Sequence, residues 1–188
     1  MARWQPDARE RLQQAALELF AEQGFAATTV PAITARAGLT TRTFFRHFTD
    51  KREVLFAGEA ELPAYAEQLI AEAPAGTSPL AIVLEGLRAV ADARFEGRKA
   101  TIRQWRAIVA SDAGLREREL QKRAALAAAV RDGFLTRGLD PARATLLAET
   151  SATLMYVSVT AWLETDEDRK LSDIIESTLA TLRATLDT

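Results

Sequence analysis

The apolar residues of this 188-residue chain recur at intervals of three to four positions over almost its whole length. This spacing is typical of α-helices that each bury one face, and no segment has the two-residue alternation of a half-buried strand. Glycine, proline and helix-capping residues interrupt the pattern at only a few points, which mark the predicted helix ends. The pattern therefore predicts an all-α fold of about nine helices. They are expected near residues 6–23, 29–37, 41–48, 51–73, 79–95, 99–110, 113–137, 141–164 and 172–186.

The segment 28–48 has the organisation of a helix-turn-helix, with two short helices on either side of a turn at Gly38. The second helix has two different faces, because Phe44 and Phe48 are four positions apart and point together toward the core. The rest of its circumference carries polar and basic residues with one aromatic residue at the border, namely Thr41, Arg42, Arg46 and Phe45.

A helix of this kind fits the major groove of DNA, where arginine can bind guanine and threonine can contact thymine or a base edge. Threonine hydroxyls, backbone N–H groups at helix starts and a nearby lysine can hold phosphates, which makes Thr28, Thr29 and Lys51 candidates. The periodicity leaves a second interpretation open. In that interpretation the segment is a small three-helix subdomain whose arginine face is merely solvated.

Composition narrows the function classes. The formal net charge is −2 and the pI is about 5.6, so the whole chain is not a polycation that coats nucleic acid. Residues 1–55 hold 8 basic residues against 6 acidic ones, so DNA affinity would come from one focused face. The chain has no cysteine and one histidine, His47, which excludes disulfides, thiolate metal sites and multi-histidine metal sites.

The terminal and apolar segments give further expectations. No apolar run approaches the roughly 20 residues that span a bilayer, and the N-terminal residues have no signal-peptide pattern. We expect a cytoplasmic protein with no membrane partner and no cofactor. Two domains are expected, a helix-turn-helix domain at 1–50 and a helical regulatory domain at 51–188.

Residues 11–55 closely resemble the DNA-binding domain of the tetracycline-repressor (TetR) family. Three phrases carry the resemblance: Ala-Leu-Glu-Leu-Phe-Ala-Glu-Gln-Gly-Phe at 16–25, Thr-Val-Pro-Ala-Ile-Thr-Ala-Arg-Ala-Gly-Leu at 29–39, and Phe-Phe-Arg-His-Phe-Thr-Asp-Lys at 44–51. The motif covers about a quarter of the chain. The length and the predicted helix order match the family as well.

The resemblance implies that 41–48 is the recognition helix. The implied base contacts are Thr41, Arg42, Phe45 and Arg46, and the implied phosphate contacts are Thr28, Thr29, Thr40, His47 and Lys51. One position departs from the family, which usually has a tyrosine where this chain has Phe45. That contact therefore differs here, because a phenolic hydroxyl is missing. Without the resemblance, His47 would be interpreted as a structural residue beside the aromatic face.

The helix at 141–164 is apolar on nearly all sides, and the helix at 172–186 carries a broad apolar stripe. Two such helices suit a two-fold, four-helix interface between subunits, although both could instead close the core of a monomer. The resemblance implies a homodimer, which suits an inverted-repeat operator in double-stranded DNA. The candidate interface residues are Leu147, Leu154, Val157, Ala161, Ile175, Leu179 and Leu182.

A pocket for an unknown small-molecule ligand is expected among the helices between 51 and 164, connected to the recognition helix through the helix that begins at Lys51. Its candidate lining residues are equally suited to the core; they are Phe56, Tyr65, Phe95, Arg103, Trp105, Met155 and Tyr156. Binding of this ligand is expected to weaken the binding of the protein to its operator.

The resulting hypothesis is a ligand-responsive transcriptional regulator, usually a repressor in the resembled family. A helical enzyme is a second class, but the chain contains no acid–base pair, metal cluster or nucleophile motif that would support it, so we expect a non-enzyme. A third class is a helical scaffold or partner-binding module without sequence-specific DNA binding.

Overall fold

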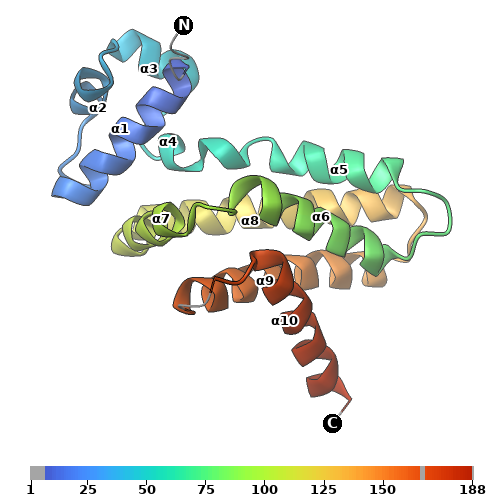
Figure 1. Cartoon of the computed structure of the whole chain (residues 1–188). Helices are drawn as coiled ribbons and strands as arrows, with labels where there is room; N and C mark the ends of the chain where they lie inside the picture. Colours follow the sequence, from blue (N-terminus) through green and yellow to red (C-terminus); the bar gives the residue numbers. More distant parts are fainter. Residues whose placement is uncertain (1–6, 166–167, 188) are drawn as a thin grey trace, which may run out of the picture. The chain divides into compact units, whose positions relative to one another are not determined.

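The computed structural model describes residues 7–165 and 168–187 (Figure 1). Within these residues it contains ten α-helices, one 3-10 helix and no strand, which confirms the all-α prediction. The helices are α1 (Ala8–Gln23), α2 (Val30–Ala37), α3 (Thr41–His47), α4 (Glu53–Phe56), η1 (Ala57–Glu59), α5 (Leu62–Glu72), α6 (Pro79–Arg94), α7 (Lys99–Ser111), α8 (Ala113–Thr136), α9 (Pro141–Glu164) and α10 (Leu171–Leu186).

The prediction of a single helix over residues 51–73 is wrong. This stretch divides into α4, the short η1 and α5, and the break lies before Pro63. Pro63 occupies the first turn of α5, where its missing N–H costs no intrahelical hydrogen bond. The proline therefore starts a helix here, and the sequence pattern alone did not distinguish a start from a kink.

The described chain forms two compact units. The first unit contains the residues up to Ala60 together with Arg103–Gln121, and the second contains Glu61–Ile102 together with the residues from Lys122 onward. Helices α7 and α8 each contribute to both units, because the divisions fall inside them. The division at residue 50 stays a prediction.

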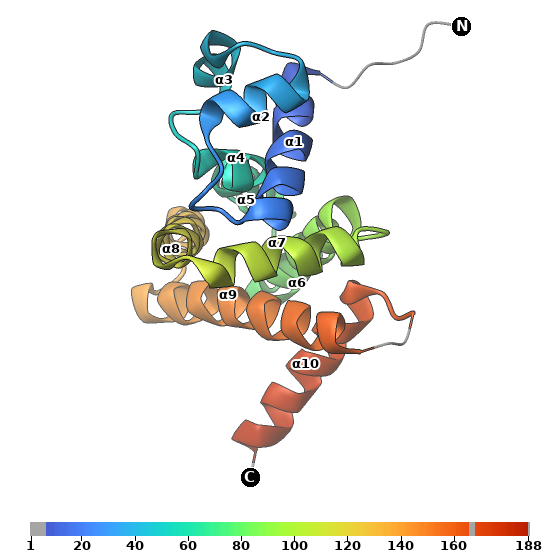
Figure 2. The ribbon, with the colours of Figure 1, turned by 90° about the vertical axis from the view of Figure 1, so that its left-hand side faces the viewer.

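In the first unit, α1, α2 and α3 pack around one apolar core and lie side by side in Figures 1 and 2. Leu12, Ile33 and Phe44 are completely buried at its centre. The second half of α7 adds Ile108 and Val109 to the same core, although they follow Ile33 by more than seventy positions. The helix-turn-helix is therefore supported by residues from far along the chain.

The second unit has two apolar clusters. One joins α5, α6, α8 and α9 around Ile82 and Phe134, and the other joins α6, α9 and α10 around Trp162 and Ile175. The packing of α9 against α10 is visible in Figure 2. In the part of the chain that the structure describes, no helix is both long and apolar enough to cross a membrane.

Candidate nucleic-acid interface

The first helix of the motif, α2, has defined ends. Thr29 caps its start by accepting a hydrogen bond from the backbone N–H of Ala32 at 3.3 Å. Its end is Gly38, which has φ 64° and ψ 36°, a left-handed conformation that glycine adopts without a Cβ clash. The backbone N–H of Leu39 then bonds to the carbonyl of Thr34 at 2.8 Å, so the chain turns sharply toward α3.

The second helix, α3, begins with another threonine cap. The Oγ1 of Thr40 accepts from the backbone N–H of Thr43 at 3.1 Å and lies 3.0 Å from the Oγ1 of Thr43. Phe44 and Phe48 are both buried, with ring centroids 5.3 Å apart. These contacts fix which side of the short helix faces the core and which side faces outward.

The outward side of α3 is the surface predicted to read DNA. Phe45 is 59% exposed, and its ring meets Phe44 edge-on with centroids 5.4 Å apart. Arg42 and Arg46 are exposed, and within residues 7–165 and 168–187 neither guanidinium forms a hydrogen bond or an ion pair. The exposed members of the predicted DNA-contacting set are Thr29, Thr40, Thr41, Arg42, Phe45, Arg46 and His47. The geometry therefore brings one aromatic side chain and two uncompensated cations to one short helix.

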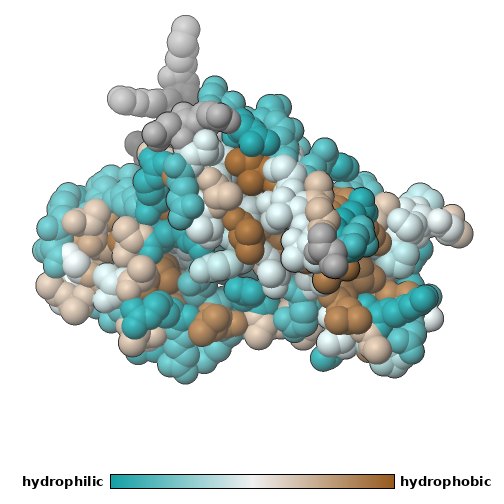
Figure 3. All heavy atoms as spheres, turned by 90° about the horizontal axis from the view of Figure 1, so that it is seen from below, coloured by the Kyte–Doolittle hydropathy of each residue, from teal (hydrophilic) through white to brown (hydrophobic). Residues whose placement is uncertain are grey.

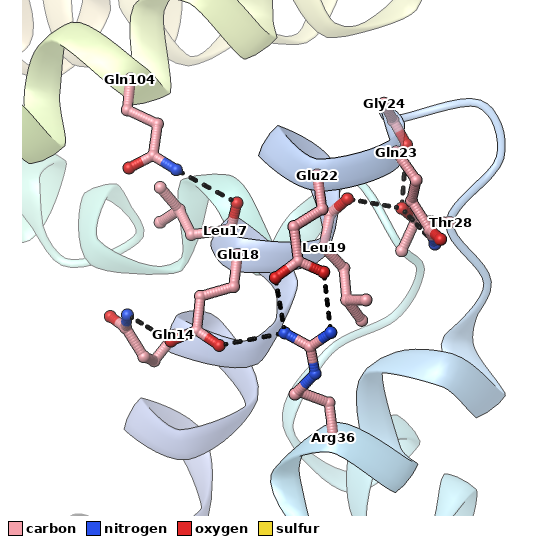
Figure 4. A network of polar contacts seen from close by, with 10 residues as sticks. All are labelled: Gln14, Leu17, Glu18, Leu19, Glu22, Gln23, Gly24, Thr28, Arg36 and Gln104. Carbon is pink, nitrogen blue, oxygen red and sulfur yellow. Dashed lines mark hydrogen bonds and ion pairs between the residues drawn. The ribbon is translucent and has the colours of Figure 1, made fainter.

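A third arginine of the motif is held differently. The guanidinium of Arg36, on α2, donates to both carboxylate oxygens of Glu22 at 2.9 and 2.8 Å and to Glu18 at 3.3 Å (Figure 4). Hydrogen bonding to Glu22 raises the pKa of Arg36, and the same contact lowers the pKa of Glu22 below its ordinary value of 4.5. Arg36 is therefore neutralised by acidic residues of α1, in contrast to Arg42 and Arg46.

Two predicted phosphate contacts, Thr28 and Lys51, have partners within the protein. Thr28 is 1% exposed, and its hydroxyl lies 2.8 Å from the carbonyl oxygen of Gly24, to which it donates. The Nζ of Lys51 donates to the carbonyls of Phe25 and Thr28 at 2.7 and 2.8 Å, and it lies 4.1 Å above the ring of Phe25. Both side chains therefore stabilise the turn between α1 and α2.

The environment of Lys51 also affects its titration. Burial lowers the pKa of Lys51 below that of free lysine, while the negative charge of Asp112 acts in the opposite direction. The carbonyl contacts occupy two of the donors that a phosphate could use. The ammonium group has three donors, so one is left for a phosphate.

The seven predicted pocket residues do not belong to one compact unit. Phe56 is completely buried in the first unit, where it meets Trp105 edge-on at 5.7 Å, and the Trp105 indole donates to the carbonyl of Leu55 at 3.0 Å. Phe56 is therefore a core residue, and the half-buried Trp105 packs against the same core. Arg103 belongs to the same unit, whereas the second unit holds Tyr65, Phe95, Met155 and Tyr156. Of these four, Phe95 and Met155 pack against the same cluster, that of α6, α9 and α10.

The predicted interface residues also divide. Leu154, Ile175 and Leu179 are buried inside their own unit and already belong to its interior. Leu147 and Leu182 are half-buried, whereas Val157 and Ala161 are exposed. Further exposed apolar residues of the same two helices are Leu146, Tyr156 and Leu186. The face drawn in Figure 3 has apolar side chains at the surface in patches between polar ones.

Sequence reasoning missed the residues that hold α2 on α1. Besides Arg36, these include Arg11, whose Nη2 donates to the carbonyl of Ala37 at 2.5 Å. The spacing of Glu18 and Glu22, four positions apart, places both carboxylates on one side of α1, and this was the available signal. Nothing local in the sequence indicates that their partner, Arg36, lies fourteen residues after Glu22 and eighteen after Glu18.

Comparisons with known proteins concern first the N-terminal part of the chain. The model of the family described as "Bacterial regulatory proteins, tetR family" matches residues 12–57. The HTH-type transcriptional regulator TcmR of Streptomyces glaucescens is 38% identical over 82 residues, which are 44% of this chain. The matched part spans only 36% of the length of that regulator.

Solved structures with similar folds cover nearly the whole chain. A putative TetR-family regulator from Syntrophomonas wolfei has a TM-score of 0.65 at 17% identity, covering 96% of this chain and 95% of its own. NalD of Pseudomonas aeruginosa, described as the secondary repressor of the MexAB-OprM multidrug efflux pump, has a TM-score of 0.61 at 18% identity, with 94% of each chain covered. At these identities the comparison establishes the fold alone.

Proposed function

The chain belongs to the tetR family of bacterial regulatory proteins through its residues 12–57, and from this premise we propose that it is a transcriptional regulator that binds an inverted-repeat operator. A homodimer would present two copies of α3 to successive major grooves. In this proposal the bound protein represses transcription, and a small-molecule ligand releases it from the operator.

The observation that carries the proposal is the state of the cations on α3. Arg42 and Arg46 are exposed and have no acidic partner in the described residues, whereas Arg36 on the neighbouring helix is neutralised. An arginine that reads guanine must keep its donors free until DNA arrives. A merely solvated surface would not require this distinction between neighbouring arginines.

Selection of bound sites from a random-sequence duplex pool with the purified full chain tests the DNA-binding class. We expect an inverted repeat whose half-sites lie about one duplex turn apart, or a multiple of it. Weak binding that is uniform over all sequences would favour the alternative, a helical scaffold or partner-binding module without sequence-specific DNA binding.

Substitution of Arg42 tests base readout within the selected site. If Arg42 binds guanine, Arg42→Ala should cost about 1–3 kcal/mol of binding free energy and relax the preference at one base position. Equal loss on every duplex would instead identify Arg42 as a phosphate contact. Phe45→Tyr tests the position at which this chain differs from the tyrosine usual in the family, because it restores a hydroxyl at an exposed position.

The dimer proposal rests on the outward sides of α9 and α10. Helices α9 and α10 pack together inside one unit. Even so, Leu146 and Leu186 on these helices remain 67% and 76% exposed. Leu146→Arg should therefore produce monomers in sedimentation experiments. Leu120→Arg, at a 62% exposed leucine of the first unit, is the matched control and should leave the assembly unchanged.

For the ligand we retain Phe95 and Met155 as the candidate contacts in the second unit, where both border the apolar cluster of α6, α9 and α10. Phe56 and Trp105 are not retained, because Phe56 is buried in the core of the first unit and Trp105 packs against that core. Typical coupling of about 1–3 kcal/mol would weaken operator binding 5- to 150-fold. A cognate ligand that strengthened operator binding at constant salt would contradict this form of the proposal.

A further inference from the structure

We propose that Arg36 is a positioning residue for DNA recognition: it clamps the end of α2 to two successive turns of α1 and so fixes the direction in which α3 is presented. Its guanidinium takes both oxygens of Glu22 and one of Glu18, which lie one helical turn apart on α1. The inference rests on the proposed function, because the direction of α3 matters only if α3 reads DNA.

The apolar contact between α1 and α2 leaves room for such a clamp. Leu12 of α1 and Ile33 of α2 fill the centre of their shared core, but on the side that faces Arg36 this core is bordered by two alanines, Ala15 of α1 and Ala37 of α2. Alanines form only shallow ridges, and it is the interlocking of larger side chains that sets the angle between packed helices. Beside this core lies an open groove of about 550 Å³, in which side chains of both helices lie. Polar side chains therefore make the connection on this side.

Arg36 lies close to the turn that connects α2 to α3, where a small rotation of α2 would change the direction of α3. It lies in the last turn of α2, two residues before Gly38, and α3 begins three residues after that glycine. From the opposite direction, Arg11 of α1 donates to the carbonyl of Ala37, the last residue of α2. A Cβ on Gly38 would lie 3.1 Å from the Nη2 of Arg11, so this corner is closely filled. Two crossed contacts thus secure the corner that leads into α3.

The same contacts make Arg36 unsuited to hold a phosphate. Two carboxylates surround one guanidinium, so the local group carries no net positive charge, and the planar fork of donors is already used in a bidentate pair. An exposed ion pair of this kind usually stabilises a fold only slightly. A large effect on DNA binding together with a small effect on folding would therefore exclude a role in fold stability alone.

The test compares Arg36→Gln, the double variant Glu18→Gln/Glu22→Gln and the combined triple variant. The probe is a short duplex that carries the site enriched in the selection described above, and its affinity is measured by anisotropy at several salt concentrations. We expect Arg36→Gln and the double variant each to weaken binding about ten-fold, and the triple variant to be no weaker than either, because all three remove one coupled unit. The slope of affinity against salt should not change.

The change in DNA affinity in the double variant Glu18→Gln/Glu22→Gln decides whether Arg36 positions α3 or contacts a phosphate. Removing negative charge near DNA normally strengthens binding, so a phosphate-contacting Arg36 predicts tighter binding in the double variant and a salt slope reduced by about 1 in Arg36→Gln. The clamp predicts weaker binding in both. Glu10→Gln is the matched control, since it removes one charge from α1 outside the ion pair, and it should not weaken binding.

A measurement without DNA separates this inference from the proposed function. Hydrogen exchange should become faster in α2 and α3 of Arg36→Gln, while α4 and the buried half of α7 keep their protection. Equal acceleration throughout the first unit, or none, would overturn the clamp. If the wild-type chain bound no duplex selectively, the proposed function would fail, whereas the exchange result would still decide whether Arg36 holds these helices.

Discussion

Ser158 on α9 is the clearest place to test how this core is held together. Its side chain is completely buried, and its Oγ has no hydrogen-bond partner among the described residues. Ser151 lies two turns earlier on the same helix and is 7% exposed, but its Oγ donates to the carbonyl of Ala148 at 2.7 Å. The two serines are thus a matched pair that differs chiefly in one hydrogen bond.

The expected magnitudes follow from that difference. Burying a hydroxyl without a partner costs about 1–3 kcal/mol, whereas a formed hydrogen bond stabilises by about 1 kcal/mol. Replacement by alanine adds a gain in helix propensity of up to about 0.7 kcal/mol at both positions, which cancels in the comparison. We therefore expect Ser158→Ala to raise the free energy of unfolding by about 1 kcal/mol or more, and Ser151→Ala to lower it or leave it nearly unchanged.

Thermal unfolding followed by circular dichroism at equal protein concentration measures the difference. The unpaired hydroxyl and the lost hydrogen bond together make a difference of about 2–4 kcal/mol between the two variants. For a chain of this length 1 kcal/mol corresponds to about 2–4 °C, so the two variants should differ in Tm by about 4–16 °C. Equal concentrations matter because association shifts the Tm of an oligomer. If Ser158→Ala were destabilised as much as Ser151→Ala, the hydroxyl of Ser158 would have to be bonded, and the reasoning would be refuted.

Three further perturbations have definite expectations. The guanidinium of Arg137 donates to three carbonyls at the end of α5, at 2.7, 2.8 and 3.3 Å, so Arg137→Ala should lower the Tm by about 2–4 °C, with Arg137→Lys less affected. Lys51→Met should destabilise the chain by about 1–3 kcal/mol because two carbonyls lose their donor. It should leave the salt slope of DNA binding unchanged, and a slope reduced by about 1 would show a phosphate contact. Since Arg36 lowers the pKa of Glu22, their stabilisation is present above pH 4.5 and is lost as the pH falls through the lower folded value. Acid unfolding curves of the wild type and Arg36→Gln should therefore converge at low pH.

The sequence predicted the helix-turn-helix closely because its signals are local. Thr29 and Thr40 cap helices that begin at the following residue, and Gly38 has the left-handed conformation that its place in the turn indicated. The two faces of α3 follow from positions three and four apart. Phe44 and Phe48 are buried while Phe45 is exposed, as expected.

The pocket and interface residues were harder to assign because burial depends on contacts between distant segments. Phe56 and Trp105 have the aromatic character of a ligand site, but the edge-on contact between them fills a core. Leu154 and Val157 belong to the same apolar helix, yet one is 2% exposed and the other 43%. Periodicity shows that such a helix has several apolar sides and does not say which side another segment of the same chain covers.

The arginines of the motif show why composition cannot replace geometry. Arg36, Arg42 and Arg46 are all exposed and lie on neighbouring short helices, so the sequence treats them alike. They differ in their ion pairs. Glu22, fourteen positions before Arg36, forms an ion pair with it, whereas no described acidic residue pairs with Arg42 or Arg46. A surface that reads DNA needs both kinds, because free donors recognise a base only if their helix is held in one direction. The acidic residues of α1 therefore support the DNA-binding hypothesis, although they lower the net charge of the domain that carries it.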